Sequence, residues 1–124
     1  MITGVFNERE VRVPLTVRGP GGQNQGVAAI IDTGFSGHLT LPLAIIKALG
    51  LDHLGQGRAL VGDGSIQVFD LYEAALIWDE ESLIIDIARA ETEPLLGISL
   101  VYGHDLRIQA IEGGKVTIEK LLRM

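Results

Sequence analysis

Hydrophobic residues recur along this chain mostly with a period of two, in short runs that glycine-rich turns separate. Apolar residues alternate with polar ones between Arg9 and Val17, which predicts a half-exposed strand. The run Val27–Ile31 is apolar without alternation and predicts a strand covered on both faces. Between them, residues 18–26 are rich in glycine and predict a loop.

The same pattern continues through the second half of the chain. Further strands are predicted over Leu39–Leu41, Gly57–Val61, Ser65–Trp78, Leu83–Ala90, Leu106–Ile111 and Lys115–Leu121. The turn Gly62-Asp63-Gly64 predicts a tight hairpin, because these residues tolerate positive φ. Asp79–Ser82 and Glu112–Gly114 also have the composition of turns.

Helix signals are few. Leu43–Leu49 is the clear candidate, since Pro42 suits a helix start and Gly50 suits a left-handed cap. Leu95–Tyr102 predicts a short turn or helix. The pattern therefore indicates an all-β domain with one or two short helices.

Composition narrows the function classes. With 124 residues and a hydrophobic fraction of 47%, the chain is expected to form a single folded domain over residues 1–124. It has no cysteine, and its net charge of -6 without a basic stripe argues against nucleic-acid binding. No apolar run reaches the ~20 residues of a membrane span, and no signal-peptide layout is visible. We therefore expect no membrane association and a cytoplasmic location.

One motif carries candidate chemistry. Asp32-Thr33-Gly34 directly follows the apolar run Val27–Ile31. A carboxylate beside apolar surroundings must be paired, hydrogen-bonded or protonated, so its position is costly unless it is used. The alternative to a functional role is a structural one, in which the Asp32 side chain caps its own turn, as the aspartate of Asp-x-Gly sequences often does.

The order of motifs around Asp32 resembles that of the retropepsin-like aspartic proteases, the single-domain relatives of pepsin. The resemblance rests on Asp32–Gly34, Leu39–Pro42, the hairpin Gly62–Gly64 and the turn Leu95–Gly97, and it covers roughly Arg9 to Leu121. A phenylalanine directly after Asp-Thr-Gly makes the bacterial members look closer than the viral ones. The implied architecture is a small, closed-barrel-like retropepsin (acid protease) fold that forms a two-fold homodimer.

The resemblance also implies roles for individual residues. Asp32 corresponds to the catalytic aspartate, Thr33 to the residue that braces the two active loops across the dimer, and Gly34 to a position of close backbone approach. Val61–Ser65 corresponds to the flap that closes over substrate, and Leu96-Gly97 to the turn beneath the active loop. The expected substrate-binding residues are Phe35, Leu60, Val61, Gly62, Asp63 and Gly64, with Ile66 and the Leu95 region as further pocket walls.

The chemistry explains why a homodimer is expected. Peptide hydrolysis by carboxylates needs a base that activates water and an acid that protonates the carbonyl oxygen. Two carboxyl groups about 3 Å apart share one proton and fill both roles. The chain offers a single Asp-Thr-Gly, so each subunit would supply its Asp32 to cleave a peptide or protein substrate. The resemblance implies that terminal strands such as Lys115–Leu121, read alone as an ordinary edge strand, interleave between subunits; whether Met1–Phe6 takes part stays open.

Two further features qualify this reading. Pepsin-like relatives commonly have a serine after Asp-Thr-Gly, and Phe35 stands there instead, so Asp32 lacks one hydrogen bond unless Ser36 supplies it. No cofactor or metal is expected, because His38, His53 and His104 are spread without ligand spacing.

Two alternatives to a general endopeptidase stay open. One is a non-catalytic module of the same fold that binds peptides or dimerises. The other is a protease dedicated to its own processing or to one partner.

Overall fold

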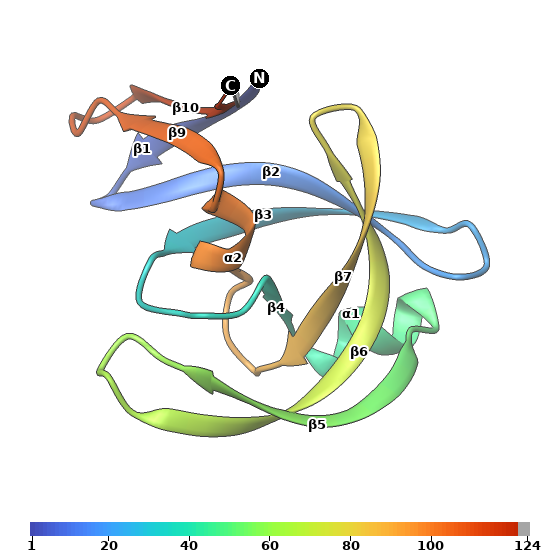
Figure 1. The fold of residues 1–124 in the computed structure, drawn as a ribbon. Helices are drawn as coiled ribbons and strands as arrows, with labels where there is room; N and C mark the ends of the chain where they lie inside the picture. Colours follow the sequence, from blue (N-terminus) through green and yellow to red (C-terminus); the bar gives the residue numbers. More distant parts are fainter. Residues whose placement is uncertain (122–124) are drawn as a thin grey trace.

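The protein has ten strands and two short helices in a computed structural model that describes residues 1–121 (Figure 1). The strands are β1 (Ile2–Asn7), β2 (Glu10–Arg18), β3 (Asn24–Asp32), β4 (Leu39–Leu41), β5 (Asp52–Leu60), β6 (Ile66–Trp78), β7 (Glu81–Arg89), β8 (Leu95–Gly97), β9 (His104–Ile108) and β10 (Gly114–Lys120). The helices are α1 (Leu43–Leu49) and α2 (Ile98–Val101). The prediction of an all-β chain with one or two short helices is confirmed. Within residues 1–121, neither helix has the length and apolar composition needed to cross a bilayer.

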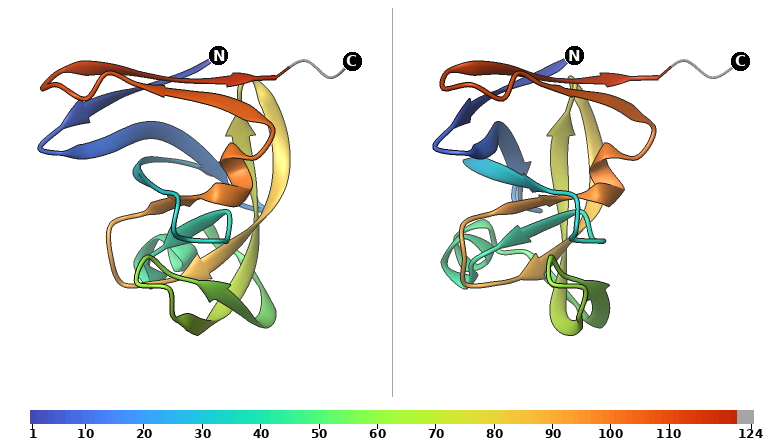
Figure 2. Two further views of the ribbon diagram at one scale, coloured as in Figure 1. Left: turned by 60° about the vertical axis from the view of Figure 1, so that its left-hand side comes forward. Right: turned by 90° about the vertical axis from the view of Figure 1, so that its left-hand side faces the viewer.

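The strands form one sheet in the order β5-β6-β7-β4-β8-β3-β2-β1-β10-β9. An additional pairing of β2 with β6 closes the middle of this order into a ring of strands. Strands β5 and β9 stand at the two ends of the order. Figure 2 shows the β5–β6 hairpin and the layer of β1, β9 and β10 at opposite ends of the molecule.

The core lies inside the ring, where alternating residues of each strand meet. Val13, Leu15 and Val17 of β2 are all buried, which confirms the period-two prediction for this strand. The largest fully buried side chains from the other elements include Leu39, Leu41, Leu76, Ile87, Leu96 and Ile118. Each such side chain contributes about 1.5–3 kcal/mol through its removal from water. Thr40 is a buried polar residue, and its hydroxyl accepts a hydrogen bond of 2.8 Å from the Leu95 N–H.

The prediction that Val27–Ile31 is covered on both faces was wrong. Val27 and Ala29 of β3 are buried, whereas Ala28 between them is exposed. Strands β2 and β8 flank β3 within the sheet, and they cover its edges but not its outer face. A short alanine-containing run therefore looks continuous in sequence although its strand has one open face.

Several strand boundaries also differ from the predictions. Strand β5 begins at Asp52 rather than Gly57, and β9 ends at Ile108 rather than Ile111. Strand β7 begins at Glu81 because Asp79 and Glu80 both have positive φ, 50° and 69°, and so make a two-residue turn.

The C-terminal strand is not an edge strand. Strand β10 pairs with β1 on one side and with β9 on the other. The expectation of an unprotected edge at Lys115–Leu121 was wrong, since Ile2–Asn7 forms a strand that covers it. The edge in this part of the sheet is β9, and the apolar continuation at Leu122 lies outside the described residues.

Candidate active site

The candidate site is the connection from β3 to β4, residues 32–38, which we call the Asp32 loop. Strand β8 lies between β3 and β4: Asp32 is in register with Gly97, and Leu39 with Leu96. The two strands that carry the loop are thus held apart by β8. The ends of β3 and β8 and the start of β4 therefore lie side by side, and the Asp32 loop lies at this place.

Backbone hydrogen bonds fix the loop to the end of β8. The Gly97 N–H donates to the His38 carbonyl at 2.7 Å, and the Ile98 N–H donates to the Phe35 carbonyl at 2.9 Å. A Cβ atom on Gly97 would overlap the carbonyl oxygen of Gly37, so this approach requires glycine. Leu96-Gly97, predicted as part of a turn or helix, is instead the end of strand β8, because it pairs with Ile31 and Asp32 of β3, and it lies directly beneath the loop.

Asp32 is half-buried at the start of the loop, whereas Thr33 and Gly34 are exposed. Its carboxylate Oδ1 accepts a hydrogen bond of 3.0 Å from the Gly34 N–H, and its carbonyl accepts one of 3.1 Å from the Phe35 N–H. These bonds are of the kind that a turn-capping aspartate makes. The carboxylate is thus oriented by the loop and is partly exposed.

The turn between β5 and β6, residues Val61–Ser65, lies against this carboxylate, and we call it the hairpin tip. A Cβ atom on Gly62 would lie 3.8 Å from both carboxylate oxygens of Asp32. A Cβ atom on Gly34 would lie 3.0 Å from the Gly62 Cα atom. The sequence placed Asp32–Gly34 and Gly62–Gly64 in one site, and the structure brings them together (Figure 1).

The hairpin tip is organised by its own hydrogen bonds. The Val61 N–H donates to the Ser65 carbonyl at 3.0 Å, and the Gly64 N–H donates to the Val61 carbonyl at 2.9 Å. Gly64 has a φ of 84°, a conformation that favours glycine. The Asp63 carboxylate accepts the Ser65 N–H at 2.8 Å, and hydrogen bonds from the side chain and backbone of Ser65 lower the pKa of Asp63.

A hollow of about 150 Å³ lies beside Asp32. Its lining residues are Asp32, Phe35, Thr40, Val61, Gln67, Phe69, Ala90, Thr92 and Leu95. Gln67 and Phe69 were not predicted as site residues. Their spacing could have identified them: they are two positions apart on β6, close after the hairpin tip, and residues two apart on a strand face the same side.

The other predicted substrate-binding residues have different surroundings. Phe35 is 2% exposed and packs edge-to-face on Phe69 with ring centroids 6.1 Å apart, so it forms the floor of the hollow. Leu60 is 46% exposed, and Ile66 is 67% exposed on the hairpin. Asp63 is exposed at the hairpin tip and does not line the hollow beside Asp32.

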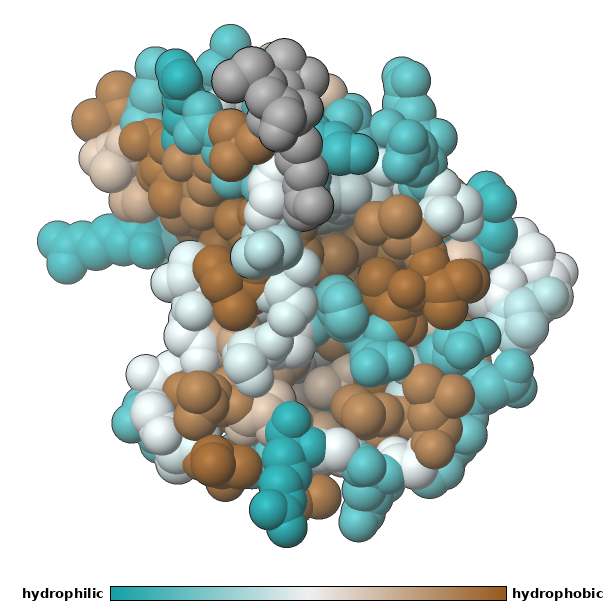
Figure 3. Space-filling view, viewed as in Figure 1, coloured by the Kyte–Doolittle hydropathy of each residue, from teal (hydrophilic) through white to brown (hydrophobic). Residues whose placement is uncertain are grey.

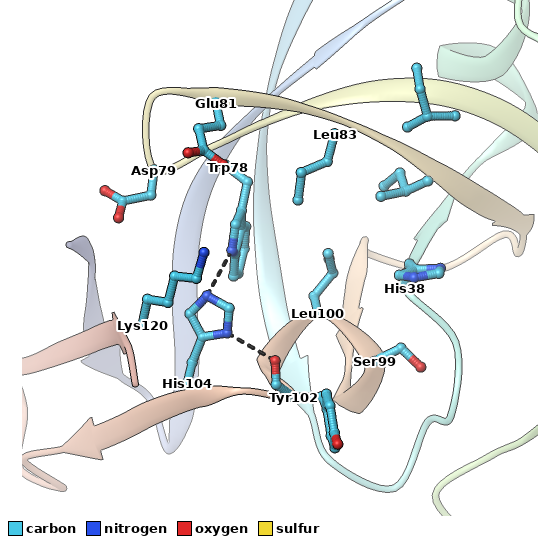
Figure 4. Close-up of a pocket in the computed structure, with 12 residues that line it drawn as sticks. His38, Trp78, Asp79, Glu81, Leu83, Ser99, Leu100, Tyr102, His104 and Lys120 are labelled. Carbon is cyan, nitrogen blue, oxygen red and sulfur yellow. Dashed lines mark hydrogen bonds between the residues drawn. The ribbon is translucent and has the colours of Figure 1, made fainter. Parts of the chain in front are cut away.

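A larger hollow of about 320 Å³ lies between the β6–β7 turn and α2, and Asp32 does not line it (Figure 4). There the Trp78 Nε1–H donates to the His104 Nε2 atom at 3.1 Å, and the His104 Nδ1 atom lies 3.0 Å from the Tyr102 carbonyl. His104 is thus held in the tautomer that carries its proton on Nδ1. On this side of the molecule, patches of hydrophobic surface alternate with polar ones (Figure 3).

Of the remaining histidines, His38 lines the same hollow as His104, and His53 does not. His53 pairs with Asp70 at 3.3 Å, and His38 lies in the Asp32 loop. Among residues 1–121, no group of three or more His, Asp or Glu side chains is arranged to hold a metal ion.

Comparison of the chain with protein-family models, with curated proteins and with solved structures gave no match.

Proposed function

We propose that this protein is an aspartic endopeptidase with a retropepsin-like fold that acts as a two-fold homodimer. The observation that carries the proposal is the position of the Asp32 carboxylate. It lies at the end of β3 in a fixed surface loop, with Gly62 of the hairpin tip against it and a partly apolar hollow beside it.

The proposed chemistry uses Asp32 from each of two subunits. One carboxylate takes a proton from water while the other, protonated, donates to the carbonyl oxygen of the scissile bond. The activated water attacks the carbonyl carbon, so no covalent intermediate forms. The second carboxylate comes from another copy of the chain, because the sequence has a single Asp-Thr-Gly.

Exposed residues on and next to the Asp32 loop support the binding of a second copy of the chain at this surface. Thr33 and Gly34 are exposed although they follow the half-buried Asp32. Ile98, whose N–H bonds to the loop, is 38% exposed, and Tyr102 at the end of α2 is 77% exposed. A two-fold contact through these residues would bury apolar surface and bring the two loops together.

An extended peptide is the substrate class that the surroundings favour. Strand β5 is at an edge of the sheet and ends next to the Asp32 loop, so a peptide strand can add to its free backbone groups. Phe35, Phe69 and Leu95 give the adjacent hollow an apolar lining for one side chain.

The test is the isosteric substitution Asp32→Asn, assayed on unfolded casein. We expect cleavage to fall by about 10³-fold or more, since a carboxamide cannot accept the proton of water. Circular dichroism and sedimentation should show an unchanged fold and oligomer. Asp86→Asn, at an exposed aspartate of β7, is the matched control and should retain activity.

The same assay separates the alternatives. Cleavage by Asp32→Asn at the wild-type rate would overturn the proposal. Peptide binding without cleavage by the wild-type protein would favour the non-catalytic module, and cleavage limited to its own chain or to one partner would favour the dedicated protease.

A further inference from the structure

Strand β5 is hydrogen-bonded to the Asp32 loop at the residue just before the hairpin tip. The Ser36 N–H donates to the Leu60 carbonyl at 3.1 Å, and the Ser36 Oγ atom accepts the Leu60 N–H at 3.0 Å. Ser36 thus bonds to both the N–H and the carbonyl of Leu60. Its hydroxyl oxygen accepts the N–H, as the carbonyl of a neighbouring strand would.

Leu60 is the last residue of β5, and β5 is the end strand of the sheet. Its N–H and carbonyl bond to Ser36 and not to β6, so they belong to the free edge of this strand. Free edge groups are the groups that an added peptide strand uses. In the free chain, Ser36 occupies them.

The position of Ser36 is itself fixed. The Ser99 Oγ–H donates to the Ser36 carbonyl at 2.6 Å, and the Ser99 N–H donates to the Gly37 carbonyl at 3.3 Å. Helix α2 therefore anchors the loop from below while Ser36 holds the hairpin tip from above. With the tip held in this way, Gly62 lies against the Asp32 carboxylate.

We propose that Ser36 is a positioning residue that latches the hairpin tip over Asp32 in the free chain, and that an extended peptide displaces this latch when it binds along β5. The proposal rests on the proposed function for its peptide, but the latch itself does not depend on catalysis. Phe35 stands where pepsin-like relatives commonly have a serine, and the Ser36 hydroxyl was the candidate to replace that hydrogen bond to Asp32. In the structure, the Ser36 hydroxyl bonds to Leu60 instead.

The experiment compares Ser36→Ala with the wild-type protein by amide hydrogen exchange at Leu60. Loss of the hydroxyl acceptor should speed exchange of the Leu60 N–H by about 3- to 10-fold, the value of one net hydrogen bond. Ser36→Thr keeps the hydroxyl and should retain slow exchange. Ser82→Ala, at an exposed serine in β7, is the matched control and should exchange like the wild type.

A second arm measures binding of a synthetic apolar peptide that carries a statine hydroxyl at its centre. Ser36→Ala should bind this peptide about 3- to 10-fold more tightly than the wild type, because no latch has to be broken. In the wild type, the bound peptide should protect the Leu60 N–H from exchange at least as well as Ser36 does, because the peptide replaces Ser36 as its hydrogen-bond partner.

Equal exchange at Leu60 in the wild type and in Ser36→Ala would overturn the latch. Faster exchange with unchanged peptide affinity would overturn its displacement by peptide. Absence of statine-peptide binding in both proteins would count against the proposed function and against peptide displacement, while exchange at Leu60 would still decide whether the latch exists.

Discussion

Gly97 shows how a single residue decides the geometry of the candidate site. It ends β8 directly beneath the Asp32 loop, and its N–H holds the His38 carbonyl at 2.7 Å. The carbonyl of Gly37 occupies the place that a Cβ atom on Gly97 would need. Any side chain here must push the loop, and Asp32 with it, away from β8.

Gly97→Ala is therefore expected to destabilise the protein by about 2–4 kcal/mol, because backbone atoms rather than a flexible side chain must move. Urea denaturation followed by the fluorescence of Trp78 measures this change. Gly26→Ala is the matched control, since no atom lies within 4 Å of a Cβ atom there. A control change within about 0.5 kcal/mol is expected. Equal stability of the two variants would contradict the close approach at Gly97.

The hairpin tip shows how a turn is built by local hydrogen bonds before it meets the rest of the site. Ser65 donates to Asp63 across the turn, and hydrogen bonds from Ser65, first from its side chain and then from its backbone, lower the pKa of Asp63 from 3.8. A lowered pKa in the folded state means that the charged carboxylate stabilises the turn. This stabilisation is present above pH 3.8 and is lost as the pH falls through the lowered pKa.

Ser65→Ala should raise the pKa of Asp63 toward 3.8, since the side-chain hydrogen bond is the largest cause of the shift. Carboxyl carbon NMR of Asp63 through an acid titration measures it. Ser82→Ala should leave the midpoint where it is in the wild type. An identical Asp63 midpoint in all three proteins would show that the Ser65 hydroxyl does not hold the turn.

The whole molecule matters for the proposed activity because each chain has one Asp-Thr-Gly loop. A shared pair of Asp32 carboxylates makes activity a property of the dimer and not of the chain. Specific activity should then fall when the protein is diluted below the dissociation constant of the dimer.

Mixing wild-type protein with an equal amount of Asp32→Asn tests this sharing directly. After subunit exchange, random pairing leaves about half of the wild-type chains in fully wild-type dimers, so activity should fall to about half. Asp86→Asn in the same mixture should leave total activity at or above the wild-type value. Activity that Asp32→Asn does not reduce would show that each chain acts alone.

Much of the strand and turn pattern was predictable because it depends on local chemistry. Helix α1 has the predicted bounds, Leu43–Leu49, and Gly50 has the left-handed conformation expected of its cap, with φ of 61°. The turn Gly62–Gly64 was likewise predicted from residues that tolerate positive φ. Strand ends were less predictable, since the turn at Asp79 and Glu80 uses positive φ without glycine.

Other features depend on which segments become neighbours. The N-terminal strand β1 covers β10 across more than 100 positions of sequence, and no local pattern indicates that pairing. Ala28 lies on an open face although the run around it is apolar.

The sequence by itself determined the all-β class and the Asp32 motif, together with the hairpin whose tip lies beside it, because strand alternation, glycine turns and a carboxylate after an apolar run are local properties. The tertiary structure alone decided that β8 separates β3 from β4, that Gln67 and Phe69 line the hollow, and that Ser36 bonds to Leu60. These contacts join residues distant in sequence, and their geometry follows from the packing of the whole sheet rather than from any one segment.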